Sequence, residues 1–153
     1  DIKRSMPALF YGDDSMFLLP KIFGMTSRAL FDEYDKLGLE ATHCIKDHPP
    51  DQEIPFVDQT FLKRSFRKNP DGHYTYALDR DTIVGSFRWV KRKNANRRDV
   101  LINTIANAQL EASRHGEVYF NEVTTRIKAG LDRLNIRNVS VCTSIANVST
   151  YYA

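Results

Sequence analysis

The chain has 153 residues, of which 42% are hydrophobic and 27% charged, and its formal net charge at pH 7 is +3. This length suits one ordinary domain, and the composition excludes collagen-like, disulfide-rich and wholly disordered proteins. No apolar stretch approaches the roughly 20 residues that a membrane-spanning helix requires, so no membrane span is predicted.

The charge is unevenly distributed along the chain. Residues 61–98 hold eleven Lys and Arg against three Asp, a net charge of +8, whereas the remainder carries −5. Aromatic residues are interleaved with these cations, and the two together suit a nucleic-acid backbone with its neighbouring sugars and bases. A solvated basic face over an aromatic core produces the same pattern, so charge alone leaves both interpretations open.

The first third of the chain predicts strands and one helix. Two apolar runs, 6–11 and 16–19, flank Gly12-Asp13-Asp14-Ser15, which predicts a β-hairpin. Thr26 and Ser27 predict the start of a helix that ends at Gly38. A strand is expected at 39–45, a loop at 47–55, and a strand or hairpin at 59–66.

Beyond residue 66 the pattern becomes helical. Thr82 is expected to cap one helix, and Asn96 to begin another that ends at Gly116. The segment 139–153 lacks clear periodicity and is expected to be a strand or frayed. A third helix is predicted at 117–134, with these side chains facing inward: Phe120, Val123, Ile127, Leu131 and Leu134.

Two adjacent carboxylates, Asp13 and Asp14, are unusual at the tip of an apolar hairpin, because neighbouring like charges repel. A divalent cation would relieve that repulsion, and hard cations such as Mg²⁺ prefer carboxylate oxygens. A two-metal site can activate a hydroxyl and stabilise a leaving phosphate together. The alternative for an isolated Asp-Asp pair is an exposed polar turn.

The string Tyr11-Gly12-Asp13-Asp14 between apolar strands resembles the catalytic palm hairpin of RNA-dependent RNA polymerases from picorna-like positive-strand RNA viruses. Gly38-Leu39 followed by Lys46 resembles the turn and general-acid lysine of that family. Phe61-Leu62-Lys63-Arg64 resembles its primer-gripping hairpin, and 86–91 resembles its thumb helix, with Trp89 expected in the thumb core. The resemblance runs in order from residue 6 to residue 134.

The resemblance implies an α+β fold in which palm β-hairpins with a packed helix are followed by a mostly helical thumb. Residues 1–70 would be the C-terminal part of the palm and 71–153 the thumb. The implied activity is RNA-directed RNA polymerisation by a two-metal mechanism, with Mg²⁺ as the cofactor and Mn²⁺ as an alternative. Asp13 and Asp14 would bind the metals, with Asp14 the weaker ligand, and Lys46 would protonate the departing pyrophosphate.

The same resemblance implies contacts with RNA. Gly12 would leave room for the primer end, and Lys63 and Arg64 would hold the primer backbone. Lys91, Arg92 and Lys93 would flank the exiting duplex through its phosphates. The implied partners are an RNA template–primer duplex and nucleoside triphosphates, and the implied location is membrane-associated replication complexes in the host cytoplasm.

Parts of the family pattern are missing from this sequence, namely the fingers and the palm strand with the first metal-binding aspartate. They are expected upstream of Asp1 in the same polyprotein product, so this chain is expected to be a fragment that is inactive alone. Two alternatives remain. A reverse transcriptase palm also ends its motif in Asp-Asp, but usually carries a residue other than Gly after the Tyr. A non-catalytic RNA-binding module or viral remnant would use only the basic segment.

Overall fold

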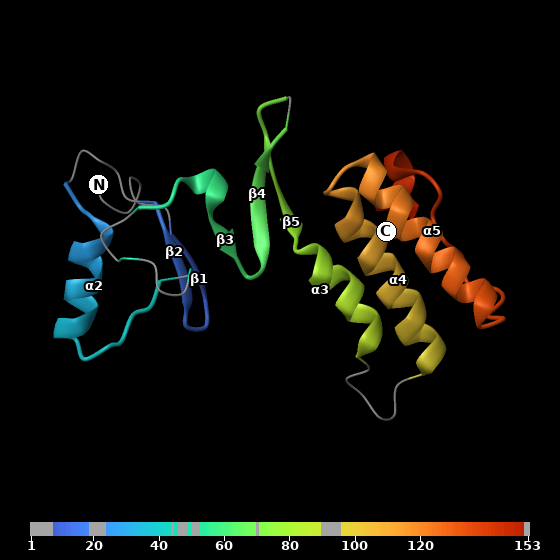
Figure 1. The fold of residues 1–153 in the computed structure, drawn as a ribbon, viewed down its shortest axis with the longest axis horizontal. Coiled ribbons are helices and arrows are strands. Elements are labelled where there is room, and N and C mark those ends of the chain that lie inside the picture. The colour runs from blue at the N-terminus through green and yellow to red at the C-terminus, as the bar shows by residue number, and fades with distance from the viewer. Residues whose placement is uncertain are drawn as a thin grey trace. The chain divides into compact units, whose positions relative to one another are not determined.

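The computed structural model describes residues 8–18, 24–43, 45, 49, 53–69, 71–89 and 96–151. The chain divides into two compact units, Asp1–Leu62 and Lys63–Ala153. Two small antiparallel sheets and several helices confirm the α+β class (Figure 1). The assignment of 1–70 to a palm and 71–153 to a thumb stays a prediction. No helix among the described residues is long and apolar enough to cross a membrane.

The first unit contains the predicted hairpin. Strands β1 (Ala8–Tyr11) and β2 (Asp14–Phe17) pair antiparallel, with Tyr11 opposite Asp14. The turn is therefore only Gly12-Asp13, and β2 begins two residues before the predicted apolar run. Gly12 has a φ of +62°, and glycine at the first central position of a two-residue turn matches the twist of the flanking strands.

Helix α2 (Ser27–Lys36) follows in the first unit as predicted. Its N-cap, Thr26, accepts a hydrogen bond from the backbone N–H of Ala29 at 3.2 Å, and Gly38 ends it with a φ of +72°. The strand predicted at 39–45 is wrong for the residues described there, which form no strand. Leu39 is exposed, so this segment lacks the burial that favours a strand. The short helix η2 (Phe56–Asp58) and strand β3 (Thr60–Phe61) complete this unit.

The second unit begins with a hairpin of β4 (Arg64–Lys68) and β5 (Tyr74–Leu78), paired so that Arg64 lies opposite Leu78. The prediction of helix beyond residue 66 is wrong for β5, which is an alternation of aromatic and β-branched residues. Helix α3 (Arg80–Gly85) begins three residues earlier than predicted. Asp79 is the cap, and its carboxylate accepts hydrogen bonds from the backbone N–H and the hydroxyl of Thr82.

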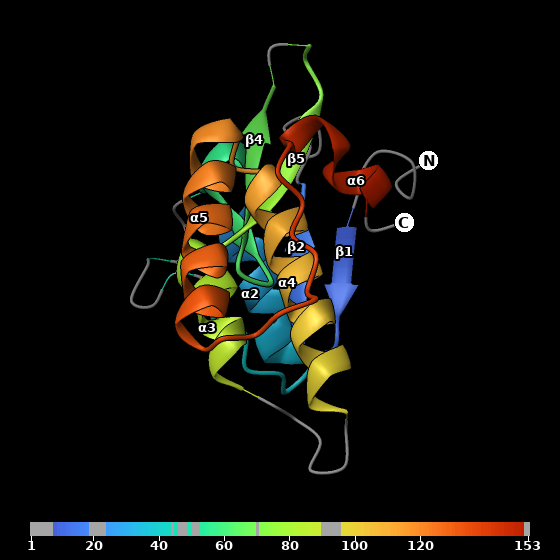
Figure 2. The same cartoon turned by 90° about the vertical axis from the view of Figure 1, so that its right-hand side faces the viewer.

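The core of the second unit lies between α3 and the long helices α4 (Arg97–Ser113) and α5 (Glu117–Arg133). Helices α4 and α5 run side by side, joined by a turn at Gly116 (Figure 2). The predicted inward stripe of α5 is confirmed except for Leu134, which is 67% exposed. Leu134 is the C-cap, so it has left the helical register that buries the four other residues.

The end of the chain is held against these helices. The amide of Gln109, buried on α4, donates hydrogen bonds to the Thr124 hydroxyl at 2.6 Å and the Cys142 carbonyl at 2.8 Å. Its carbonyl oxygen accepts the Cys142 backbone N–H at 3.1 Å. Helix η4 (Ile145–Asn147) and helix α6 (Val148–Tyr151) follow, with Val148 buried in the core. The expected strand or frayed tail is therefore wrong for these residues.

Candidate active-site hairpin and RNA-contacting turn

The hairpin of the first unit presents two carboxylates at its tip. Asp13 occupies the second position of the two-residue turn, and Asp14 is the first residue of β2. Both residues are exposed. No ion pair among the described residues involves either of them. The hairpin therefore holds both carboxylates in solvent at one end of a two-stranded ribbon.

The register of the hairpin decides which side chains share a face with Asp14. Alternation along the strands puts Tyr11, Asp14 and Met16 on one face. Met16 is the side chain that anchors this face, at 8% exposure. On the opposite face Phe10 and Phe17 meet edge to face, with ring centroids 5.4 Å apart. The hairpin therefore has a buried methionine on the face of Asp14 and an aromatic pair on the opposite face.

The donor chemistry of the tip fits a hard divalent cation. Carboxylate oxygens are ligands of Mg²⁺ and Mn²⁺, and two adjacent carboxylates repel less when a cation lies between them. Among the described residues, no group of three or more His, Cys, Asp or Glu side chains forms a metal-binding cluster. Asp13 and Asp14 by themselves could supply only part of a coordination sphere, and the remaining oxygens would have to come from other groups.

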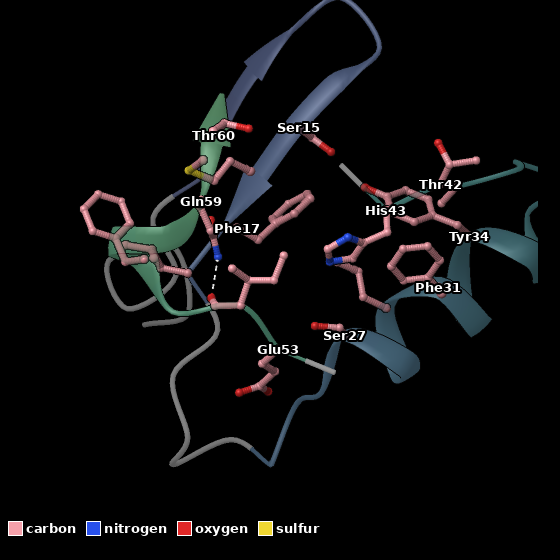
Figure 3. Close-up of a pocket in the computed structure, with 16 residues that line it drawn as sticks. Ser15, Phe17, Ser27, Phe31, Tyr34, Thr42, His43, Glu53, Gln59 and Thr60 are labelled. Carbon is pink, nitrogen blue, oxygen red and sulfur yellow. Dashed lines mark hydrogen bonds between the residues drawn. The ribbon is translucent and has the colours of Figure 1, made fainter. Parts of the chain in front are cut away.

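A cavity of about 280 Å³ lies beside this hairpin, lined by residues of β2, α2 and the segments around 42 and 54–60 (Figure 3). Phe17, Phe31 and His43 point into it, and Nδ1 of His43 accepts the Ile45 backbone N–H at 3.1 Å. Neither Asp13 nor Asp14 is among the described residues that line it. The cavity therefore lies between α2 and β2, away from the carboxylates.

The predicted primer-gripping motif forms a tight turn. Leu62 and Lys63 connect β3 to β4 with φ values of +51° and +60°, a left-handed conformation that costs a residue with a Cβ about 1–2 kcal/mol. The carbonyl of Lys63 accepts the backbone N–H of Asp79 at 2.8 Å. The Lys63 side chain is exposed, and no ion pair among the described residues includes it. This turn presents a single cation to solvent.

Arg64, the last residue of that motif, has a different environment. Its guanidinium donates two parallel hydrogen bonds to the Glu111 carboxylate on α4, both 2.8 Å long. The two side chains are only 28% and 15% exposed. Burial acts to raise the pKa of Glu111, but the Arg64 hydrogen bonds and the charges of Arg114 and Arg64 outweigh it and lower the pKa.

Two further side chains complete this arrangement, which we call the Arg64 cluster: Arg64, Tyr76, Glu111 and Arg114. The guanidinium carbons of Arg64 and Arg114 lie 5.5 Å and 4.8 Å from the centre of the Tyr76 ring. Arg114 also contacts Glu111 at 3.9 Å and donates to the Tyr76 carbonyl at 3.3 Å. The cluster fastens the β4–β5 hairpin to α4. Sequence reasoning missed Glu111, which lies 47 residues from Arg64.

His115 joins the same hairpin to the end of α4. Its Nε2 lies 2.7 Å from the Leu78 carbonyl, and its buried Nδ1 has no hydrogen-bond partner among the described residues. Burial lowers the pKa of His115, the bond to Leu78 opposes this, and the positive charges of Arg67 and Arg80 lower it further. Because the Leu78 carbonyl can only accept a hydrogen bond, Nε2 is the nitrogen that donates to it.

Several predicted residues fall elsewhere. Lys46, Lys91, Arg92 and Lys93 lie outside the described residues. Trp89 was expected in the thumb core, but it is 76% exposed. The α-helical register ends at Gly85, a 3₁₀ turn follows, and Trp89 is extended, so its side chain leaves the stripe that packs on α4.

Comparison with known proteins identifies the family. The family model for viral RNA-dependent RNA polymerases matches residues 1–131. The genome polyprotein of feline calicivirus is 30% identical over 128 residues, covering 78% of this chain and 7% of the polyprotein. That of vesicular exanthema of swine virus serotype A48 is 29% identical over 130 residues, again covering 78% and 7%. The genome polyprotein of human hepatitis A virus genotype IB (isolate HM175) is 28% identical over 135 residues, covering 85% and 6%.

The match includes the carboxylate hairpin, the Lys63 turn and the helices α3, α4 and most of α5. The chain spans less than a tenth of the length of the polyproteins that it matches. The predicted resemblance to polymerases of picorna-like viruses is confirmed. The chain belongs to the viral RNA-dependent RNA polymerase family.

Proposed function

We propose that this chain supplies the metal-binding hairpin and the primer-contacting turn of an RNA-directed RNA polymerase that replicates a viral genome. One observation supports this most strongly. Two exposed carboxylates stand at the tip of a two-residue turn, within a chain whose family model covers residues 1–131. The substrates would be an RNA template–primer duplex and nucleoside triphosphates.

In the proposed reaction, the primer 3′-hydroxyl oxygen bonds to the α-phosphorus of a nucleoside triphosphate. The bond to the β-phosphate breaks, and pyrophosphate leaves. A pair of bound Mg²⁺ or Mn²⁺ ions would lower the pKa of the hydroxyl and neutralise charge on the phosphates. Asp13 would hold that cation, with Asp14 as the weaker ligand. Further oxygen ligands would come from an upstream aspartate of the same polyprotein product, from water and from phosphate.

Other residues of the chain would handle the proton and the RNA. Lys46 would donate a proton to the departing pyrophosphate, because a lysine of ordinary pKa is charged at neutral pH. Gly12, with no side chain at the turn, would let the primer end approach. Lys63 would bind a primer phosphate, and Lys91, Arg92 and Lys93 would contact the exiting duplex. Arg64, the other residue of the predicted grip, is already engaged by Glu111.

The proposal is tested by primer extension with the complete polymerase that contains these residues. Asp13→Asn is expected to abolish Mg²⁺-dependent extension and leave RNA binding nearly unchanged, because the amide cannot replace a charged metal ligand. Asp35→Asn is the matched control, since it makes the same chemical change at an exposed position of α2 and should extend normally. Extension by Asp13→Asn at the unmodified rate would contradict the metal assignment.

The same assay separates the alternatives. Extension on an RNA template with ribonucleotides supports the proposal, whereas extension only with deoxyribonucleotides would indicate a reverse transcriptase. RNA binding by a complete polymerase that extends nothing would indicate a non-catalytic RNA-binding module. The 153-residue chain alone is expected to bind RNA without extending it, because the fingers and the first metal-binding aspartate of the family pattern are not in its sequence.

A location for the polymerase is proposed from the family resemblance. We place the polymerase at membrane-associated replication complexes in the host cytoplasm, held there by partners. Co-sedimentation of the complete polymerase with membranes from infected cells, and its release by high salt, would support this placement. Recovery only in the nuclear fraction would contradict it.

A further inference from the structure

We propose that Arg64 and Glu111 form a positioning pair that fixes the turn carrying Lys63, and that Lys63 supplies the phosphate-binding charge of this turn. The inference rests on the proposed function, because it concerns the turn that would contact the primer. It assigns a role to Glu111, and it changes the expected role of Arg64 from RNA ligand to support.

The first argument is that the guanidinium of Arg64 is already occupied. Its two hydrogen bonds to Glu111 have the parallel geometry that Arg and carboxylate prefer, and both side chains are partly buried. To bind a phosphate, Arg64 would have to leave Glu111 in a partly desolvated site beside Arg114 alone. Breaking such a pair by removing one partner is costly.

The second argument is that the ring of Tyr76 restricts Arg64 further. Tyr76 pairs with Phe66 in the hairpin, so its ring projects from the same face as the Arg64 and Leu78 side chains. Arg64 lies over this ring at 5.5 Å, with Arg114 at 4.8 Å. Glu111 contacts both cations, so one carboxylate is shared between two guanidinium groups. An RNA phosphate would therefore have to compete with Glu111 for a guanidinium group that the Tyr76 ring also covers.

The third argument concerns the strain of the turn. Leu62 and Lys63 both have positive φ values, which residues with a Cβ keep only when neighbouring contacts hold them. Two anchors follow directly. The Lys63 carbonyl accepts the N–H of Asp79, the cap of α3, and the next side chain, Arg64, binds Glu111 on α4. Both anchors lie within the second unit, and together they fix where the turn stands.

The fourth argument is the contrast with Lys63. Its ammonium group is exposed and in no ion pair among the described residues. A lysine on a flexible stem binds phosphate as a point charge and needs no fixed geometry of its own. It does need its backbone in the right place, which the two anchors provide.

The experiment is a charge reversal across the pair in the 153-residue chain. Arg64→Glu, Glu111→Arg and the double variant are compared by thermal melting and by anisotropy of a fluorescein-labelled RNA primer–template duplex. Binding is measured between about 50 and 200 mM salt, because the slope of log affinity against log salt counts phosphate contacts. Each single variant is expected to melt earlier and to bind RNA about tenfold more weakly. The double variant is expected to recover both properties to within about twofold of the original binding.

Two further variants define the RNA contact and the control. Lys63→Ala is expected to melt normally but to lose about one phosphate contact, a decrease of about 0.9 in the salt slope. The exposed pair Arg126–Glu122 on α5 is the matched control for charge reversal, with its atoms 3.4 Å apart and its side chains 66% and 54% exposed. Its double reversal should move neither melting nor binding. Should Arg64→Glu fail to fold, Arg64→Lys keeps the charge without the parallel hydrogen bonds and should melt earlier with an unchanged salt slope.

Each outcome decides one question. A double variant that regains its melting temperature but still lacks one phosphate contact would show that Arg64 itself binds RNA, and would overturn the positioning role. If the double variant does not regain the melting temperature lost by the single variants, the proposed Arg64–Glu111 positioning pair is wrong. If Lys63→Ala binds RNA as tightly as the original chain, the proposed RNA contact at this turn is wrong, whatever the melting temperatures show.

Discussion

The two tight turns of this chain reach the same unusual backbone region in different ways. The carboxylate turn uses Gly12 at a φ of +62°, and no atom lies within 4 Å of where a Cβ would stand. The Lys63 turn uses Leu62 and Lys63 at +51° and +60°, where glycine would be the unstrained choice. The first turn is therefore favourable on local grounds, and the second depends on contacts made far along the chain.

The two units also differ in how much buried packing they contain. Met16 is the buried hydrophobic side chain of the first unit among the residues that the structure describes. In the second unit a continuous core joins α3, α4, α5 and the segment around Cys142 and Val148. The strained turn thus begins the better-packed unit, whose rigidity can hold it. The Gly12 turn lies in the unit with little buried packing, and its unstrained backbone does not need packing to hold it.

The largest expected effect tests this difference in packing. Phe120 is fully buried, and Phe120→Ala should reduce the free energy of unfolding by about 3–5 kcal/mol because it leaves a cavity in the core. Phe10→Ala removes the same atoms from a residue that is 67% exposed and should cost about 1 kcal/mol, mainly its contact with Phe17. Urea unfolding followed by circular dichroism measures both. Equal losses would contradict the contrast in packing between the two units.

A smaller effect compares the turns directly, and its sign should reverse between them. Gly12→Ala introduces a Cβ at positive φ and should destabilise the hairpin by about 1 kcal/mol. Lys63→Gly removes a Cβ at positive φ and should raise the free energy of unfolding by about 0.5–1 kcal/mol. It should also lower the affinity for RNA, because the charge is lost. Lys63→Ala loses the charge but keeps the strain.

Calorimetric melting of these three variants measures the reversal. Lys63→Ala should melt close to the original chain, and Lys63→Gly above it. A destabilised Lys63→Gly would mean that the turn is not strained, and that the contrast with Gly12 is wrong.

The smallest expected effect is the pH dependence of the contact between His115 and the hairpin. The pKa of His115 is lowered from 6.5 in the folded chain, chiefly by burial. Near pH 6.5 His115 therefore binds a proton more readily in the unfolded chain than in the folded chain. The free energy of unfolding should fall as the pH drops below about 6.5. The pKa of Glu111 is lowered from 4.5, so its contribution should be lost only at still lower pH, through its folded pKa.

Melting temperatures between pH 8 and pH 5 (a window of about one and a half units on either side of the usual histidine pKa) measure the histidine step. His115→Gln keeps a donor for the Leu78 carbonyl but cannot titrate, so its profile should be flatter over this range. An equally steep profile for His115→Gln would assign the step to another group.

The parts of the fold that depend on local chemistry were predictable. The carboxylate hairpin, the cap at Thr26 and the end of α2 at Gly38 all follow from turn and capping preferences. Strand β5 was missed although Tyr74, Thr75 and Tyr76 alternate as a strand does, because the whole segment beyond residue 66 was predicted to be helical. The exposed position of Trp89 was missed because nothing in its neighbours shows that the α-helix ends at Gly85.

The site residues that belong to short sequence motifs were predictable, and those that are joined by long-range contacts were not. Asp13, Asp14 and Lys63 come from short motifs, and their roles stay predictions until the variants above are measured. The engagement of Arg64 could not be foreseen, since its partner Glu111 is on a helix 47 residues away and no spacing rule connects them. The i, i+3 relation of Glu111 to Arg114 was the only local hint.

The amide of Gln109 has a consequence for how this chain tolerates sequence change. It holds the backbone carbonyl and N–H of Cys142, and leaves the thiol to donate to the Ser144 carbonyl at 3.3 Å. Hydrogen bonds to the main chain of position 142 do not depend on which side chain is present there. Replacing Cys142 with another small residue should therefore keep both backbone bonds, whereas position 109 needs a side chain that is donor and acceptor at once.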